Sequence, residues 1–257
     1  TVPEGTVYPE AIFAGELIEN SGIRKTGLRT GATWEALVND TLGLVQAMPG
    51  AFRNLAVNTL ERDVITTLVN ASGLPTFAGG TSVDGTVVVP DAPISRAALA
   101  VAITQLKNQV KTAYNGTVNG GFNLIVAVGQ ADLANFLINS LSLDSIADGP
   151  RTFSVNAGNP LSSITVIESV YVTSTTEWYL IPKKGTTQRP VLERLTLVGH
   201  EQAELRVNNL TGNYIGGSSV PPFEGSLDSD MIDWRVRLVT GSVLWSPQAV
   251  VHSDGTP

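Results

Sequence analysis

The stretch of residues 33–70 (TWEALVNDTLGLVQAMPGAFRNLAVNTLERDVITTLVN) constrains the fold of this chain most. Its apolar residues recur at helical spacing and form one continuous stripe: Val38, Leu42, Val45, Met48, Phe52, Leu60, Val64 and Leu68. Thr33 can cap the start of this helix, and Glu35 places a negative charge in its first turn. Pro49 and Gly50 are expected to bend the helix without ending it, because the stripe resumes in phase beyond them.

A single helix over this stretch would be roughly 50 Å long at about 1.5 Å per residue. Such a length is several times that of an average helix. It therefore suggests a plate-shaped subunit that spreads across its neighbours. The alternative is a pair of ordinary core helices split at Met48-Pro49.

The composition favours a protein whose surface is covered by copies of itself, since only 15% of its 257 residues are charged and 42% are hydrophobic. A stable extracellular domain is equally compatible with this composition. The net charge of −7 makes general binding to a phosphate backbone a poor prediction.

Several features are missing from the sequence. It has no cysteine, so it has neither disulfides nor a cysteine metal site. No apolar run approaches the roughly 20 residues of a membrane span. The start, TVPEGTVYPE, lacks both a secretory pattern and an initiator methionine, which suggests that a segment was removed or that the ordered part begins here.

The segment before the long helix, residues 1–32, is rich in glycine and proline. Its short apolar patches at 11–14 and 17–18 precede a turn at 20–22, a pattern compatible with a two-stranded hairpin. The segment holds too few apolar residues to fold alone, so it must lie on another surface. A disordered leader is the alternative.

The rest of the chain alternates helices and strands. Ser95 is expected to cap a second helix that runs to about Lys111. The unbroken apolar run FNLIVAV at 122–128 predicts a strand that is buried on both faces. The remaining predicted elements are a helix at 131–141 and strands near 164–167, 178–181 and 205–207, with a half-buried strand at 232–239.

No catalytic constellation is visible, and we predict no enzyme activity, no catalytic residue, no cofactor and no metal. The two histidines offer little choice of base: His200 is read as an ordinary loop residue, and His252 as part of a flexible tail. Asp228, Asp230 and Asp233 could bind a divalent cation in principle, but no EF-hand pattern completes them. A solvated entry to the next strand is the preferred interpretation.

The order of these elements, together with several short stretches, resembles the major capsid proteins of tailed bacteriophages with the Hong Kong 97-type fold. The stretches that carry the resemblance are GLRTGATWEALVNDTLGLVQAMP, PTFAGGTSVDGTVVVPDAPISRAALAVAITQLKNQ, FNLIVAVGQADLANFLINS, WYLIP, LVGHEQAE and DWRVRLVTGSVLWSPQAVV. The implied fold class is α+β, with a long spine helix, an E-loop, a P-domain and an A-domain. The implied division is an N-arm at 1–9, the E-loop at 10–32, the P-domain at 33–118, the A-domain at 119–227 and a closing strand returning to the P-domain at 228–257.

The resemblance implies a structural function. Subunits of this family form the hexamers and pentamers of an icosahedral shell around packaged double-stranded DNA, without sequence-specific binding and without a membrane. Portal, scaffold and decoration proteins are the further partners implied, with assembly in the host bacterial cytoplasm and residence in the virion. Lys25 is the only lysine in the E-loop, and no acceptor motif for cross-linking accompanies it. The alternatives are an encapsulin-type shell around cargo protein and a minor head or decoration protein.

The resemblance also suggests which charges meet between subunits. Arg24, Lys25 and Arg29 form a positive group in an acidic chain. In the resembled fold this loop overlies the neighbouring P-domain, where Glu61 and Asp63 are available on the long helix. We expect these opposite charges to set the docking register between subunits.

Overall fold

The computed structural model describes residues 22–40, 43–82, 85–139, 146–148, 151–153, 160–208, 214–219 and 230–256. Its helices are α1 (Trp34–Val38), α2 (Leu44–Val69), α3 (Arg96–Tyr114) and α4 (Ala131–Asn139), with 3-10 turns η1 (Pro160–Ser163) and η3 (Pro247–Ala249). Its strands are β1 (Arg24–Thr33), β2 (Gly80–Thr81), β3 (Val87–Val88), β4 (Phe122–Val126), β5 (Ile146–Asp148), β6 (Arg151–Phe153), β7 (Ile164–Glu168), β8 (Trp178–Pro182), β9 (Leu192–Thr196), β10 (Glu204–Val207), β11 (Met231–Leu244) and β12 (Val251–Ser253). No helix among these residues is both long enough and apolar enough to cross a bilayer.

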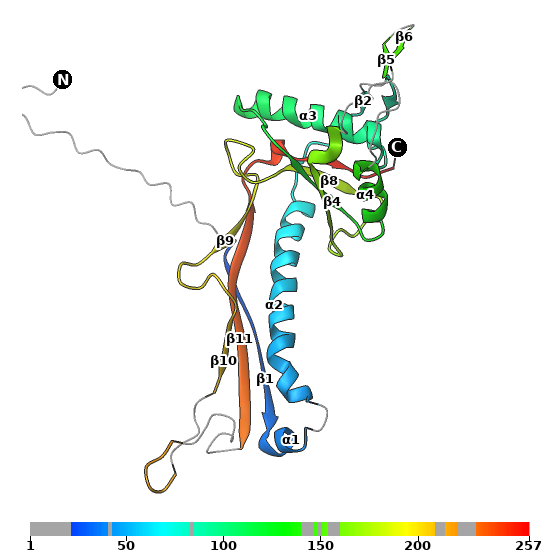
Figure 1. The fold of residues 1–257 in the computed structure, drawn as a ribbon. Helices are drawn as coiled ribbons and strands as arrows, with labels where there is room; N and C mark the ends of the chain where they lie inside the picture. Colours follow the sequence, from blue (N-terminus) through cyan, green and yellow to red (C-terminus); the bar gives the residue numbers. More distant parts are fainter. Residues whose placement is uncertain are drawn as a thin grey trace, which may run out of the picture.

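The elements form a long arm and a more compact head (Figure 1). In the arm, β1 and β10 pair with the two edges of β11, and β9 pairs with β11 farther along the same strand. Helix α2 lies alongside β1 and β11 in this arm. In the head, a second sheet has the strand order β12-β8-β4-β7, and α3 and α4 lie beside it. The expected mixture of helices and sheets is therefore confirmed.

The arm is held by the alternating pattern of β11. Its buried residues Ile232, Trp234 and Val236 pack with Phe52 of α2, whereas the residues between them face away from the helix. This contact places the apolar stripe of α2 against the buried face of β11. Among the described residues, these four make up the buried cluster of the arm, together with a few half-buried neighbours, so this part of the arm is thin.

The stretch at 33–70 is not one continuous helix. Thr33 caps the short α1, accepting a hydrogen bond from the backbone of Ala36 at 3.2 Å as expected, but α1 ends at Val38. Helix α2 then begins after Gly43, whose φ of 67° lies in the left-handed region. A side chain is disfavoured in that conformation, so this glycine marks a real interruption.

Helix α2 itself runs through Pro49, as predicted, and there is no split at Met48-Pro49. The proline lies within the first two turns, where it removes one hydrogen bond near the frayed end of the helix. The helix therefore begins about ten residues later than the sequence suggests, and it continues for 26 residues.

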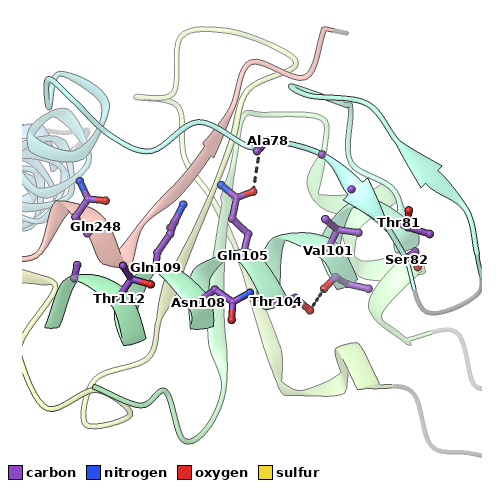
Figure 2. Close-up of a pocket in the computed structure, with 14 residues that line it drawn as sticks. Ala78, Thr81, Ser82, Val101, Thr104, Gln105, Asn108, Gln109, Thr112 and Gln248 are labelled. Atoms are coloured by element: carbon purple, nitrogen blue, oxygen red, sulfur yellow. Dashed lines mark hydrogen bonds between the residues drawn. The ribbon is translucent and has the colours of Figure 1, made fainter. Parts of the chain in front are cut away.

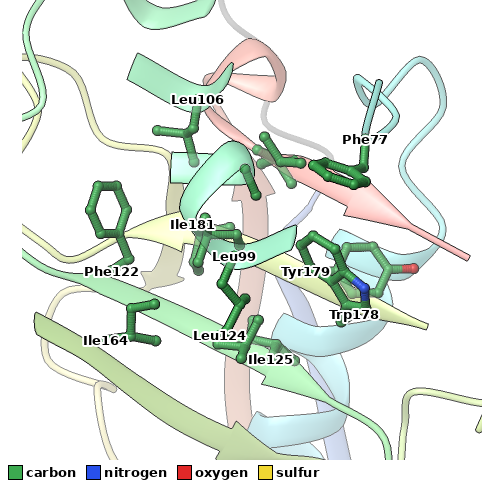
Figure 3. Packing of buried hydrophobic residues seen from close by; sticks show 14 of the residues in the cluster. Phe77, Leu99, Leu106, Phe122, Leu124, Ile125, Ile164, Trp178, Tyr179 and Ile181 are labelled. Atoms are coloured by element: carbon green, nitrogen blue, oxygen red, sulfur yellow. The ribbon is translucent and has the colours of Figure 1, made fainter. Parts of the chain in front are cut away.

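The head contains the larger core (Figure 3). Every residue of β8 is buried, as are Phe122, Leu124 and Ile125 of β4, which confirms the prediction of a strand covered on both faces. The strand is shorter than predicted and ends at Val126. Trp178 anchors this core with its ring centroid 5.4 Å from that of Phe77.

Helix α3 covers this core. Ser95 caps it as predicted, accepting a hydrogen bond from the backbone of Ala98 at 3.1 Å. The face toward the sheet carries Leu99, Leu106 and other small or apolar residues, and the helix continues to Tyr114, slightly beyond the predicted end.

The C-terminal residues do not form a flexible tail, which corrects the interpretation of His252. Strand β12 pairs antiparallel with β8, placing His252 opposite Tyr179. The same residue pairs with the segment before α3: its backbone N–H donates to the carbonyl of Pro75 at 3.1 Å, and its carbonyl accepts from Phe77 at 2.6 Å. The sequence lacked a signal for this because β12 is only three residues long.

Several predicted features lie outside the described residues. They are the N-arm at 1–9, the hairpin patches at 11–14 and 17–18, and Asp228. The strand expected near 205–207 is β10, which pairs with β11 in the arm, as does β9, a strand that the sequence did not predict; β12 pairs with the head sheet.

Candidate assembly surfaces

The described residues of β1 lie on the chain's own sheet. Their register pairs Arg24 with Thr240 and Thr33 with Met231. Two of the positive residues predicted to reach a neighbouring subunit, Arg24 and Arg29, therefore have partners within the chain.

Arg24 and Asp63 form the first of these contacts. The Arg24 guanidinium donates to the Asp63 carboxylate at 2.7 Å, and Ser242 donates to the other carboxylate oxygen at 3.0 Å. Asp63 has only 10% of its side chain exposed, whereas Arg24 has 69%. The contact therefore joins β1, α2 and β11 of a single chain at a nearly buried carboxylate.

The other interface candidates do not meet in this way. Arg29 pairs with Asp233 at 2.5 Å, and this hydrogen bond lowers the pKa of Asp233 below its usual value. Ser169, which follows β7, donates to Glu61 at 2.7 Å and so links α2 to the head. Lys25 is exposed. That these five residues also act between subunits stays a prediction.

Arginines gather on the face of the arm sheet that is turned away from α2. The register places Arg235 of β11 between Arg29 of β1 and Arg206 of β10. Like charges directly opposite one another on a sheet are destabilising. Arg235 is exposed and has no ion pair within the described residues, so this arginine row is suited to an acidic surface.

Glu204 balances one end of the arginine row. Arg206 and Arg237 donate to its carboxylate at 2.8 and 2.7 Å, and His200 contacts the other oxygen. These hydrogen bonds lower the pKa of Glu204 to about 2, and the hydrogen bond from His200 has the largest effect. His200 is thus part of a charge network at the surface of the arm.

Large apolar side chains are exposed in both parts of the molecule. In α4, Phe136 is 72% exposed and Leu133 is 51% exposed, and in α2 Val57 is 55% exposed. Next to Val57 lies a groove of about 490 Å³ between α2 and β10, floored by apolar residues that include Phe52 and Leu205. Exposed apolar patches rimmed by charge mark protein–protein contact sites.

A hollow whose lining contains no charged residue lies along α3 (Figure 2). It has a volume of about 580 Å³, and amides and hydroxyls such as Gln109, Thr104 and Gln248 line it. Gln105 spans it by accepting from the backbone of Ala78 at 3.0 Å. Its lining holds no nucleophile–base pair and no group of ligands for a metal.

The acidic group considered from the sequence does not form a cation site within the described part. Asp233 is engaged by Arg29, and Asp230 adopts a φ of 46° just before β11. A different group was missed: Glu177, His252 and Asp254 lie together at the edge of the head. Glu177 is 75 residues before His252 in sequence, and no motif connects the two.

The comparisons with known proteins agree with one another. A family model described as phage capsid protein matches residues 22–253. The capsid of the Myoviridae phage XM1 superposes with a TM-score of 0.51 at 10% identity, covering 90% of this chain and 72% of that chain. An encapsulin complex from Synechococcus elongatus PCC 7942 superposes with a TM-score of 0.48 at 10% identity, covering 91% of this chain and 74% of that chain. Mycobacterium phage Patience superposes with a TM-score of 0.48 at 12% identity, covering 98% of this chain and 77% of that chain. No curated protein matches the chain.

Proposed function

We propose, from the premise that this chain belongs to the phage capsid protein family, that it is the repeating subunit of an icosahedral shell around packaged DNA. The family match carries the conclusion, since it spans nearly the whole described chain. The chain is a capsid shell protein with the Hong Kong 97-type fold. The hexamers and pentamers, the enclosed DNA and assembly in the host cytoplasm are the finer parts of the proposal.

The thin arm supports this proposal. In the described part of the arm the buried cluster has four residues, yet exposed apolar side chains lie on α2, on β10 and on the turn before β10. Val198 is 91% exposed and Leu205 is 44% exposed. A neighbouring subunit that covered these side chains would add the burial that the arm lacks by itself.

The charge distribution supports contacts between copies of the chain. Within the arginine row, Arg29 and Arg206 have acidic partners but Arg235 has none among the described residues, and the chain as a whole is acidic, with a net charge of −7. An adjacent copy is therefore an electrostatically suitable neighbour. The same net charge suits a shell that encloses DNA without binding it tightly.

Electron microscopy of the purified full-length chain tests the shell. Closed particles are expected, and a stable monomer at high concentration would contradict the proposal. Deletion of residues 10–30 should leave a soluble chain that forms no particles, because the part of the predicted E-loop before β1 is expected to lie on a neighbour. Part of that deletion removes β1, so circular dichroism must first show that α2 and the head remain folded.

The content of the particles separates the two kinds of shell. If the shell encloses DNA, particles from infected or induced cells should contain nuclease-protected double-stranded DNA. A stoichiometric cargo protein in place of DNA would favour the encapsulin-type alternative. Portal, scaffold and decoration proteins would appear as minor bands in the same preparation.

A further inference from the structure

Glu177, His252 and Asp254 bring three potential metal ligands to one point. Glu177 lies just before β8, His252 is in β12, and Asp254 follows it. The Nε2 atom of His252 is 2.9 Å from a carboxylate oxygen of Glu177 and 3.3 Å from one of Asp254. All three ligand atoms lie within 4.8 Å of one another.

The imidazole of His252 is held in a fixed orientation. It stacks on the ring of Tyr179, with 4.7 Å between centroids and 22° between planes. Its backbone N–H and C=O are hydrogen-bonded to Pro75 and Phe77, and its strand pairs with β8 on the other side. A ligand with so little freedom loses little entropy when it binds an ion.

The Nε2 atom of His252 lies near two carboxylates, those of Glu177 and Asp254. An imidazole carries at most one hydrogen on Nε2, so it can donate a good hydrogen bond to only one carboxylate at a time. The carboxylates of Glu177 and Asp254 are also like charges at close range. A divalent cation between the three groups would satisfy both carboxylates and the nitrogen together.

The surroundings also fit a small ion. Zinc binds imidazole nitrogen and carboxylate oxygen at about 2.0–2.2 Å, which leaves ligand atoms roughly 3–4 Å apart. The side chains of Glu177 and His252 are each 17% exposed and that of Asp254 is 60% exposed, so the group is sheltered on one side and open on the other. The Tyr179 hydroxyl is hydrogen-bonded to Glu177, a supporting contact of the kind that orients metal ligands.

The other histidine provides a contrast. His200 also contacts a carboxylate, that of Glu204, but Arg206 and Arg237 both donate to the same carboxylate. Two guanidiniums at that distance repel a cation, and they already occupy the Glu204 carboxylate that would bind it. The chain has only two histidines, so each serves as the control for the other.

We propose that Glu177, His252 and Asp254 form a site for one divalent transition-metal ion of the zinc class, with water completing the coordination. The bound ion ties the C-terminal strand β12 to the loop before β8 and so stabilises the head. The site does not depend on the proposed shell function, because all three ligands come from one chain.

Isothermal titration of zinc into the full-length chain, after treatment with a chelator, tests the site. One ion per chain is expected, with a rise in melting temperature that grows with zinc concentration. Glu177→Gln and Asp254→Asn should each weaken binding by about tenfold or more, and His252→Gln should abolish it. His200→Gln should bind zinc as well as the parent chain does.

Cobalt gives an independent readout, since its visible absorption in a four-coordinate site is intense. That absorption should be present in the parent chain and in His200→Gln, and absent in His252→Gln. No saturable zinc binding, or binding that survives His252→Gln, overturns the proposal. Asp254→Asn changes an exposed side chain and should fold normally. If His252→Gln unfolds, the zinc affinity of Asp254→Asn therefore tests the site.

Discussion

Replacement of Phe52 by alanine is the most direct test of how the arm is held together. Phe52 is 7% exposed and packs with Ile232, Trp234 and Val236, the whole of the buried cluster in the arm. Truncating a buried phenylalanine costs about 3–5 kcal/mol. We expect about 3 kcal/mol, the lower end of that range, because Phe52 also borders an open groove into which its neighbours can relax.

Leu55→Ala is the control from the same helix, one turn away. Its side chain is 45% exposed and is not part of the buried cluster. The loss should therefore be about 1 kcal/mol or less, since much of its apolar surface is already in water. Both variants keep the helix propensity of alanine, so their difference reports packing.

The measurement is urea denaturation of subunits that are not assembled into particles, combined with hydrogen exchange detected by mass spectrometry. Phe52→Ala should lose amide protection in β1 and β11, while β4 in the head should keep it. If the denaturation midpoint of Phe52→Ala equals that of Leu55→Ala, the cluster does not hold the arm and the reasoning is wrong.

Three further predictions concern charge and capping. Asp63→Asn should lower the free energy of unfolding by about 1 kcal/mol. The double reversal, Arg24→Glu with Asp63→Lys, should give a more stable subunit than either reversal alone. If it does not, the result would count against the pairing of Arg24 with Asp63 within the chain. The pKa of Glu204 is lowered to about 2, so its contribution is present above its unfolded pKa near 4.5 and is lost as pH falls toward 2. A melting temperature measured through that window should fall less steeply in Glu204→Gln, and an unchanged slope would refute the assignment. Ser95→Ala removes the cap of α3 and should cost about 1 kcal/mol in thermal denaturation, whereas Ser95→Asp should retain the stability.

Local patterns predicted much of the fold. The unbroken apolar run gave β4, the alternation of polar and apolar residues gave β11, and Ser95 gave the start of α3. The break before α2 was missed because Gly43 was read as a helix interior residue. A glycine is tolerated there, and only its positive φ distinguishes the two cases.

Long-range pairing could not be predicted from the sequence. The positive group at Arg24 was expected to reach a neighbouring subunit, and its contact with Asp63 depends on the pairing of β1 with β11, more than 200 residues away. The group around His252 has the same origin: three side chains converge only after β12 has paired with β8. Neither contact leaves a local signal in the sequence.

The pairing of β1 with β11 also determines when the arm can form during synthesis. Arg24 lies opposite Thr240, so the first described strand has no partner until the residues of β11 have been made. At roughly 5–20 residues per second, translation takes on the order of 10–40 s to cover that interval. The head strands β4, β7 and β8 are complete earlier, although their sheet also waits for β12. A nascent chain therefore lacks a finished arm until β11 has been made, and the surface by which subunits would join becomes available only then.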